Sequence, residues 1–356
     1  MRPGLQPSPT KSRLVIAPQW VGDAVMASPM IASLSEAGPV DVACLPGLTD
    51  LFAAMPAVRQ VMPLAFERGQ LQWGLRRALG RSLQGRHYSQ AIVCPNSWKA
   101  ALLPWFAQIP QRTGLLGEWR FGLVNDRREA RPSADGQQAS QPAQYDALAD
   151  QPDQAQAQRK SHRPLLVATG HEVPSPQRPR LALCPGAAYG PAKQWPTASF
   201  AALAAQWIGH GGEVVLLGGP GDRPVSGAIA QAIAAEQPTG PSAQAALVVE
   251  KTGQTSLGQA MAWLASSQVV VSNDSGLMHL AAALGRPCIG LYGSSSEQQT
   301  PAFGPHWLAV SLDLPCRPCF DRTCRLGTTA CLRDLEVGQV VSLLQSRGWW
   351  PDRLDC

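Results

Sequence analysis

The sequence predicts an α/β protein built from two doubly wound domains. In each half of the chain, short apolar segments typical of strands alternate with segments of helical periodicity, which is the pattern of a parallel sheet. Polar motifs containing Gly follow several of these strands, where open parallel sheets bind ligands. A Gln- and Pro-rich stretch separates the halves. The 356 residues, 45% hydrophobic and 15% charged, are enough for two globular domains.

The first half is expected to form an N-terminal domain over residues 1–126. Its strands are expected at residues 14–17, 40–44, 59–63 and 90–94, and its helices at 24–37, 71–83 and 98–107. Because a helix separates most successive strands, we expect the strands to be parallel.

The second half is expected to form a domain over residues 180–335, followed by a C-terminal helix and tail at 336–356. Its strands are expected at residues 180–184, 213–218, 246–250, 269–272 and 288–292, and its helices at 200–210, 224–236, 257–266 and 277–284. This repeats the alternation of the first half and predicts a second doubly wound sheet.

Residues 127–179 are rich in Gln, Ala, Pro and Asp and poor in large apolar side chains. Such a segment buries too little surface to offset the entropy lost on ordering it. We therefore expect a mobile insertion or linker, with one short helix at "YDALA", residues 145–149.

The formal charge of +5 is unevenly distributed. Residues 59–128 hold eleven Lys or Arg against three Asp or Glu. A basic surface there would suit an anionic partner or membrane, and the alternative is a solvated Arg-rich face without a partner. No segment approaches the roughly 20 apolar residues of a membrane helix. The first twelve residues lack the apolar core of a signal peptide, so we expect a cytosolic protein.

Asp23 is the only charged residue in residues 14–34 and follows the first expected strand. One interpretation is a helix N-cap, which is worth about 1 kcal/mol. The other is a functional carboxylate, because Gly22 permits a close approach of ligand to backbone. A carboxylate held by helix amides would keep a low pKa and stay ionised.

Three further junctions in the second half carry candidate ligand-binding residues. In "CPGAAYGPAKQWP", Lys193 ends a Gly-rich loop and is a good point charge for a phosphate, whereas Trp195 and Phe200 are expected in the core. In "VVLLGGPGDRP", Asp222 could accept ribose hydroxyls or cap a helix. In "VVVSNDSGLMHLAAALGRP", the helix start forms an anion site to which Ser275 adds a hydroxyl. There, Asp274 could instead be a cap, and His279 a half-buried core residue.

The motifs "WVGDAVMASPMIASL", "CPGAAYGPAKQWP" and "NDSGLMHLAAALGRP" with "LYGSSS" resemble those of the ADP-heptose–lipopolysaccharide heptosyltransferases, glycosyltransferase family nine. The form G-P-A-K-x-W-P resembles the type II rather than the type I enzymes. The resemblance covers residues 14–125 and the chain from residue 180 to the C-terminal helix. The Gln- and Pro-rich stretch has no clear counterpart.

The resemblance implies a GT-B fold, in which two Rossmann-like domains face each other across a cleft. It implies an inverting transfer of L-glycero-D-manno-heptose from ADP-heptose to the first heptose of the lipopolysaccharide inner core on Kdo–lipid A. No cofactor is required. The acceptor would bind the N-terminal domain and the donor the C-terminal domain, with the enzyme cytoplasmic and peripheral on the inner membrane. Asp23 matches the position of the catalytic base.

The resemblance also assigns the donor site. Lys193 and the amides that follow Ser275 would stabilise the leaving diphosphate. Type I enzymes carry hydroxyls just before the lysine, where this chain has Ala188 and Tyr189, so those contacts would fall to the backbone. The remaining matched positions are Asp222 for the ribose, Thr255 on the adenine side, and Asp274, Ser275, Gly276, Leu277 and His279 around the diphosphate.

Four of the nine cysteines are clustered in "CRPCFDRTCRLGTTAC". The spacing of Cys316, Cys319, Cys324 and Cys331 is compatible with a structural zinc or iron–sulfur site, with reduced thiols or with disulfides. Four others lie in apolar strand-like segments and are expected in the core: Cys44, Cys94, Cys184 and Cys288. Cys356 is expected to be a free thiol.

Three alternatives remain open from the sequence. The chain could be another family-nine heptosyltransferase, either type I or one acting later in the core. It could also be a non-enzymatic module that binds nucleotide sugars or nucleic acid, for which the clustered cysteines are the main support. Aromatic residues are not interleaved with the basic ones as in RNA-binding proteins, so no nucleic-acid partner is expected.

Overall fold

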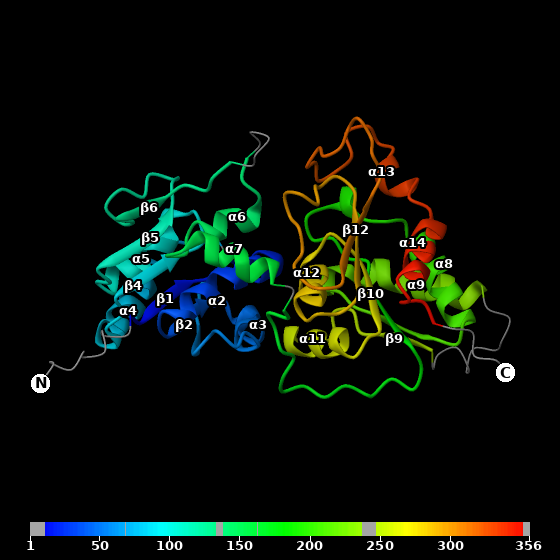
Figure 1. Cartoon of the computed structure of the whole chain (residues 1–356), viewed down its shortest axis with the longest axis horizontal. Helices are drawn as coiled ribbons and strands as arrows, with labels where there is room; N and C mark the ends of the chain where they lie inside the picture. Colours follow the sequence, from blue (N-terminus) through cyan, green and yellow to red (C-terminus); the bar gives the residue numbers. More distant parts are fainter. Residues whose placement is uncertain (1–10, 68, 133–137, 162, 237–246, 352–356) are drawn as a thin grey trace, which may run out of the picture. The chain divides into compact units, whose positions relative to one another are not determined.

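The chain forms two compact units, each built on a six-stranded parallel sheet (Figure 1). Unit 1 comprises Met1–Ser161 and unit 2 comprises His162–Cys356. The structure is a computed structural model that describes residues 11–67, 69–132, 138–161, 163–236 and 247–351. The predictions for the first ten residues and for Cys356 lie outside these ranges. The expected α/β class with two doubly wound sheets is confirmed.

The sheet of unit 1 has the order β3-β2-β1-β4-β5-β6. Its strands are β1 (Arg13–Ile16), β2 (Val40–Cys44), β3 (Gln60–Pro63), β4 (Gln90–Val93), β5 (Gln111–Leu115) and β6 (Asp126–Arg128). Its helices are α1 (Val21–Met26), α2 (Ser28–Glu36), η1 (Pro46–Leu48), α3 (Thr49–Ala53), α4 (Trp73–Leu83), η2 (Gln84–Arg86), α5 (Trp98–Phe106), α6 (Gln141–Asp146) and α7 (Pro152–Lys160). The chain order reverses between the neighbouring strands β1 and β4, which makes their carboxyl ends the switch point of this sheet.

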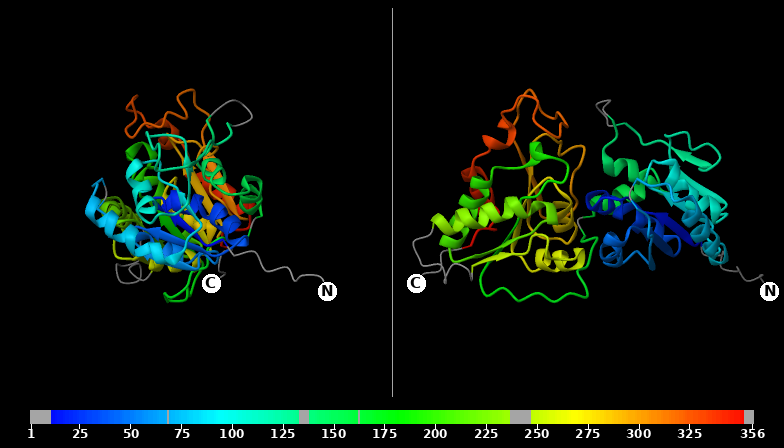
Figure 2. Two further views of the ribbon diagram at one scale, coloured as in Figure 1. Left: turned by 90° about the vertical axis from the view of Figure 1, so that its left-hand side faces the viewer. Right: turned by 180° about the vertical axis from the view of Figure 1, so that it is seen from behind.

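The helix expected at residues 24–37 is two helices, α1 and α2. Pro29 lies in the first turn of α2, where its missing N–H costs nothing, but the same residue could not continue α1. Every residue of β1, β2 and β4 is buried, because helices cover both faces of the sheet (Figures 1 and 2).

The sheet of unit 2 has the order β12-β11-β10-β7-β8-β9, with its switch point between β7 and β10. Its strands are β7 (Arg180–Cys184), β8 (Glu213–Leu216), β9 (Val248–Glu250), β10 (Val269–Asn273), β11 (Cys288–Tyr292) and β12 (Trp307–Ser311). Its helices are η3 (Pro191–Lys193), α8 (Thr197–Gly209), η4 (Pro220–Asp222), α9 (Arg223–Glu236), α11 (Leu257–Ala265), α12 (Gly276–Ala283), α13 (Ala330–Arg333) and α14 (Val337–Ser346). All five expected strands and the C-terminal helix are present.

The description of residues 127–179 as one mobile linker is wrong for the part that the structure describes in unit 1. The strand β6 extends the sheet, and α7 packs against α2. The short helix ends at Asp146 rather than covering "YDALA". Composition was misleading because the few apolar side chains here are small and well placed: Leu148, Ala149 and Ala155 are fully buried.

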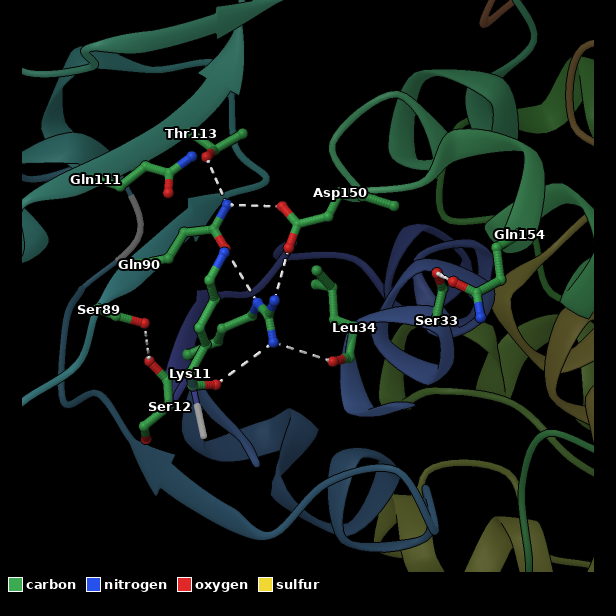
Figure 3. Close-up of polar contacts among 12 residues, drawn as sticks. Lys11, Ser12, Ser33, Leu34, Ser89, Gln90, Gln111, Thr113, Asp150 and Gln154 are labelled. Atoms are coloured by element: carbon green, nitrogen blue, oxygen red, sulfur yellow. Dashed lines mark hydrogen bonds and ion pairs between the residues drawn. The ribbon is translucent and has the colours of Figure 1, made fainter. Parts of the chain in front are cut away.

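A buried polar network fastens this segment to the sheet (Figure 3). The Arg13 guanidinium donates to Asp150 Oδ2 at 2.6 Å, to Gln90 Oε1 at 3.0 Å and to the Leu34 carbonyl at 3.2 Å. The Gln90 amide donates to Asp150 Oδ1 at 3.2 Å and to Thr113 Oγ1 at 3.0 Å. Although burial raises the pKa of Asp150, the hydrogen bonds from Arg13 and Gln90 outweigh burial and leave it below its usual value.

The prediction that four cysteines are core residues is confirmed, since Cys44, Cys94, Cys184 and Cys288 are all buried. Among the described helices, none combines the length and the apolar composition that crossing a membrane requires.

Candidate functional site

The switch point of unit 2 brings together the residues of two separate sequence motifs. Lys193 lies on η3 in the loop after β7, and Asp274 directly follows β10, the neighbouring strand. Lys193 Nζ lies 2.5 Å from Asp274 Oδ2, and the two side chains are only 14% and 4% exposed. The structure therefore fixes a cation at the strand edge where parallel sheets bind ligands.

His279 lies against this ion pair, with Nε2 3.8 Å from Asp274 Oδ1. Burial lowers the pKa of His279 to about 4, and the opposing effect of Asp274 is smaller. The imidazole is therefore neutral near pH 7. Its Nδ1 atom is buried and has no hydrogen-bond partner within the described chain. His279 is a polar, uncharged group of the site rather than a second cation.

Asn273 fastens the two motifs to each other. Its amide donates to the Pro185 carbonyl at 2.7 Å, and its Oδ1 accepts from the Trp195 backbone N–H at 3.0 Å. Trp195 and Phe200 pack edge to face in the core at 1% and 0% exposure, as predicted. The loop that carries Lys193 is thus held at both ends by buried groups.

The helix α12 begins beside Asp274. Its N-cap is Ser275, whose side chain makes no cap hydrogen bond and instead lies 3.1 Å from Ser272 Oγ. The first amides of α12 belong to Gly276 and Leu277, and such helix starts favour anions through their N–H groups and the helix dipole.

Asp222 lies at the same edge, after β8. It makes the helix-capping contact that the sequence offered as the alternative to ribose binding. Its Oδ2 accepts from the Gly219 N–H at 2.8 Å. The carboxylate also lies against the loop after β7, because a Cβ on Gly186 would come within 2.2 Å of Asp222 Oδ2. Thr255 lies between β9 and α11 and is partly exposed.

In unit 1, Asp23 lies in the first turn of α1, at the carboxyl end of β1. The N-cap interpretation is wrong: the N-cap is Trp20, which makes no side-chain cap. The low pKa expected for Asp23 is also wrong. Burial raises the pKa of this carboxyl group, and a hydrogen bond from the Tyr145 side chain only partly offsets that.

A cavity of about 450 Å³ opens at this edge of the unit 1 sheet. It is lined by residues at the ends of β1, β2 and β4 and by the basic side chains of Arg76 and Lys99. Arg76 is buried and donates to the Leu71 and Lys99 carbonyls at 2.6 and 3.0 Å, so it is also structural. Small-molecule cavities combine a few placed polar groups with apolar walls, which here include Phe66 and Trp98.

The clustered cysteines line one small pocket of unit 2 as free thiols. Cys324 Sγ accepts from the Thr329 N–H at 3.4 Å, and backbone N–H groups lower its pKa. In the described parts of the chain, no group of three or more His, Cys, Asp or Glu side chains could hold a metal ion. The geometry therefore does not support the metal site expected at Cys316, Cys319, Cys324 and Cys331.

Comparison with known proteins decides the family. The family model described as glycosyltransferase family 9 (heptosyltransferase) matches residues 76–330. The chain belongs to glycosyltransferase family 9. Lipopolysaccharide heptosyltransferase 2 of Salmonella typhimurium is 39% identical to this glycosyltransferase over 303 residues, covering 81% of the chain and 84% of the relative. The Escherichia coli protein of the same name gives the same identity and coverage.

Solved structures support the fold of this family 9 glycosyltransferase. The structure of E. coli ADP-heptose lps heptosyltransferase II aligns with a TM-score of 0.75 at 34% identity and covers 94% of this chain and 98% of that one. An E. coli heptosyltransferase with ADP has a TM-score of 0.69 at 18% identity, covers 94% and 99% of the two chains, and shows the fold alone. The neighbours confirm the GT-B fold class.

Sequence reasoning missed the packing of α6 against α1, the helix that carries Asp23. The Tyr145 side chain of α6 lowers the pKa of Asp23, although burial of that carboxyl group raises it by more. The only sequence signal was an aromatic residue inside a stretch otherwise poor in large apolar side chains.

Proposed function

We propose that this glycosyltransferase moves L-glycero-D-manno-heptose from ADP-heptose to the first heptose of the lipopolysaccharide inner core on Kdo–lipid A. The names of the relatives at 39% identity support this choice of donor and acceptor. The structural observation that carries it is the pairing of Lys193 with Asp274 at the switch point of unit 2, beside the start of α12. That arrangement suits a diphosphate.

In this proposal unit 1 binds the acceptor and Asp23 is the base. Asp23 takes the proton from the acceptor hydroxyl while the oxygen of that hydroxyl forms a bond to the anomeric carbon of heptose. On the opposite face of that carbon, the bond to the ADP oxygen breaks, which inverts the configuration. A raised pKa makes Asp23 a stronger base than an ordinary carboxylate, as general base catalysis near neutral pH favours.

Unit 2 holds the donor in this proposal. Charge develops on the ADP diphosphate as the bond breaks, and the Lys193 ammonium with the amides of Gly276 and Leu277 stabilises that charge. In this proposal these groups stabilise the leaving diphosphate, and no cofactor is required. The further donor contacts are proposed as Asp222 to the ribose, Thr255 on the adenine side, and Asp274, Ser275 and His279 around the phosphates.

For the cysteine pocket we propose a role outside catalysis, with reduced thiols in place of a metal ion. The pocket is formed mainly by the segment before α13 and the start of that helix. Its lining includes Ala192 of η3 but none of the residues proposed to contact the donor. The absence of a metal-holding group in the described chain supports this choice.

We also propose a cytoplasmic enzyme that binds peripherally to the inner leaflet of the cytoplasmic membrane, where the acceptor lipid resides. A second cavity in unit 1 is lined by Arg77, Arg81 and Arg112 together with Trp105. On the same helix as Arg77, Trp73 is 48% exposed. Of the three arginines, Arg77 and Arg81 are exposed, and exposed arginines beside tryptophan suit an anionic membrane interface.

Co-sedimentation with lipid vesicles tests the membrane proposal. The protein should bind vesicles containing phosphatidylglycerol more tightly than vesicles of phosphatidylcholine alone. Arg77→Glu should weaken that binding, whereas Arg347→Glu, a matched exposed change in unit 2, should not. Equal binding to both kinds of vesicle would contradict the proposed surface.

Incubation with ADP-heptose and a heptosyl-Kdo-lipid A acceptor, followed by mass spectrometry, tests the reaction. We expect one heptose to be added by the wild type and none by Asp23→Asn. Calorimetry should find ADP-heptose binding retained in Asp23→Asn and weakened in Lys193→Ala. Full transfer by Asp23→Asn would remove Asp23 as the base. An inactive wild type that shifts RNA in a gel would favour the nucleic-acid-binding alternative.

A further inference from the structure

We propose that Arg322, in the cysteine-rich segment before α13, is a second cation of the donor site and binds the diphosphate together with Lys193. The inference rests on the proposed function, in which unit 2 holds ADP-heptose. It adds a binding residue from a segment whose cysteine spacing pointed only to a metal, to reduced thiols or to disulfides.

The proposed donor contacts are short of positive charge. Lys193 is the only cation among them, and its Nζ already lies 2.5 Å from Asp274 Oδ2. Asp222 brings a second carboxylate to the same edge, and His279 is neutral near pH 7 because burial lowers its pKa to about 4. Each phosphate of ADP-heptose carries negative charge, and more charge develops as ADP leaves. Because the proposed reaction uses no cofactor, another side chain has to supply the balancing charge.

Arg322 and Lys193 share one aromatic ring. Arg322 Cζ lies 5.1 Å from the centre of the Tyr189 ring, and Lys193 Nζ lies 5.0 Å from the same centre. Both distances are within the range in which the face of an aromatic ring attracts a cation. The separation of the two cationic groups cannot exceed the sum of these distances, and a diphosphate hydrogen-bonded at both ends can bridge it.

The Arg322 guanidinium is accessible to a ligand. The residue is exposed, and the neighbouring carboxylate of Asp321 lies 3.7 Å from Arg325 instead. Within the described ranges of the chain, Arg322 takes part in no ion pair. A planar guanidinium can donate two parallel hydrogen bonds to one phosphate. Arg322 therefore supplies what the buried and already paired Lys193 lacks.

Backbone contacts fix Arg322 against η3 and the loop before it. The Ala192 N–H donates to the Arg322 carbonyl at 3.1 Å. A Cβ on Gly190 would lie 2.4 Å from the same oxygen, so only glycine permits this approach. The Tyr189 hydroxyl donates to the Phe320 carbonyl at 2.5 Å. These contacts use the backbone of Arg322 and its neighbour, so they persist when the Arg322 side chain is changed.

The cysteine-rich segment is also fastened to the sheet edge. The Arg317 guanidinium, only 9% exposed, donates to the Gly293 carbonyl at 2.6 Å. The Ser294 carbonyl accepts from the Cys319 N–H at 3.1 Å. Gly293 and Ser294 directly follow β11, which is the neighbour of β10 in the sheet. Arg322 is thus carried by a segment that is anchored where the strands of unit 2 end.

Calorimetry with ADP and with adenosine tests the inference, because only ADP carries the diphosphate. In Arg322→Gln we expect the affinity for ADP to fall about tenfold or more, since a charge-assisted hydrogen bond is lost, and the affinity for adenosine to stay unchanged. Added salt should shrink the difference between wild type and variant. Arg322→Lys should recover part of the loss, because it keeps the charge but not the planar fork. An equal change for both ligands, or none for ADP, overturns the inference.

Arg325→Gln is the matched control. Arg325 belongs to the same segment, and its side chain is 63% exposed. Its replacement should leave the affinity for ADP unchanged. Thermal unfolding should show that Arg322→Gln is as stable as the wild type, because the backbone contacts of Arg322 remain. An equal loss of ADP affinity in the two variants would indicate only the overall charge of the segment and would overturn the specific contact.

Transfer assays separate this inference from the proposed function. A wild type that binds ADP but transfers no heptose overturns the proposed function, and the comparison of ADP with adenosine still decides the role of Arg322. In an active enzyme we expect Arg322→Gln to lower kcat/KM for ADP-heptose and to leave the KM for the acceptor unchanged. A raised KM for the acceptor at unchanged ADP affinity would assign Arg322 to the acceptor and refute its role at the diphosphate.

Discussion

Replacing Asp150 with Ala should loosen α6 and α7 from unit 1. The carboxylate holds the Arg13 guanidinium at 2.6 Å, and the Arg13 side chain is only 1% exposed. Arg128 also approaches Asp150, at 3.5 Å. Without Asp150, Arg13 remains buried beneath the segment without its counter-charge, although the hydrogen bonds to Gln90 and the Leu34 carbonyl persist.

The size of the effect follows from burial. Removing one partner of a fully buried ion pair costs about 3–5 kcal/mol. Here the Asp150 side chain is 33% exposed, so water screens part of the interaction and the expected cost falls to about 2 kcal/mol. At 1.4 kcal/mol per factor of ten, that cost raises the population of the open segment about 30-fold.

Hydrogen exchange read by mass spectrometry measures this opening. Peptides covering residues 141–160 should exchange about 30-fold faster in Asp150→Ala, while peptides from unit 2 should be unchanged. Asp153→Ala, an exposed change on α7, is the control and should leave exchange near the wild-type rate. If Asp150→Ala leaves the exchange of residues 141–160 unaltered, the ion pair does not hold this segment and the magnitude argued above is refuted.

Two other predictions concern acid stability and the thiols. In the folded protein the pKa values of Asp41 and Asp150 lie below the unfolded value of about 4. The stabilisation that these two carboxylates provide is therefore complete above that pH and is lost as the pH falls through the folded-state values. We expect the urea midpoint of unfolding to drop between pH 5 and pH 3. In a Cys356→Ser sample, emission spectroscopy should find no stoichiometric zinc or iron, and one zinc per chain would contradict the proposal of reduced thiols. Ellman's reagent should modify the partly exposed cysteines of residues 316–331 before the buried cysteines.

The sequence was a good guide to the central strands, but it missed β5 and β6 at one end of the first sheet and β12 at one end of the second. The strands β1, β7 and β10 are buried on both faces and therefore appear as apolar runs. The strands β5 and β6, "QRTGL" and "DRR", lie toward one edge of their sheet, where polar side chains meet solvent, and no apolar pattern distinguishes them from loop.

The same limit applies to the site. Lys193 and Asp274 could be predicted together because both follow strands, and parallel strands end at one edge. Their 2.5 Å pairing required the strand order, in which β7 and β10 are neighbours. The packing of α6 against α1 had no such rule behind it. It follows from tertiary structure rather than from any local pattern.

Gly186→Ala offers a way to test Asp222 without removing its charge. A Cβ on Gly186 would lie 2.2 Å from Asp222 Oδ2, too close for any stable contact. All three carboxyl atoms of Asp222 would lie too close to the added Cβ, so we expect this side chain to turn away while the backbone of the loop is retained. If Asp222 holds the ribose, calorimetry should show weaker ADP binding in Gly186→Ala, with a stability loss of about 1 kcal/mol because the contact with the Gly219 N–H is broken. Gly227→Ala on α9, where an added Cβ has no neighbour within 4 Å among the described residues, is the matched control and should leave ADP affinity unchanged. Wild-type affinity in Gly186→Ala would show that the position of Asp222 has no part in nucleotide binding.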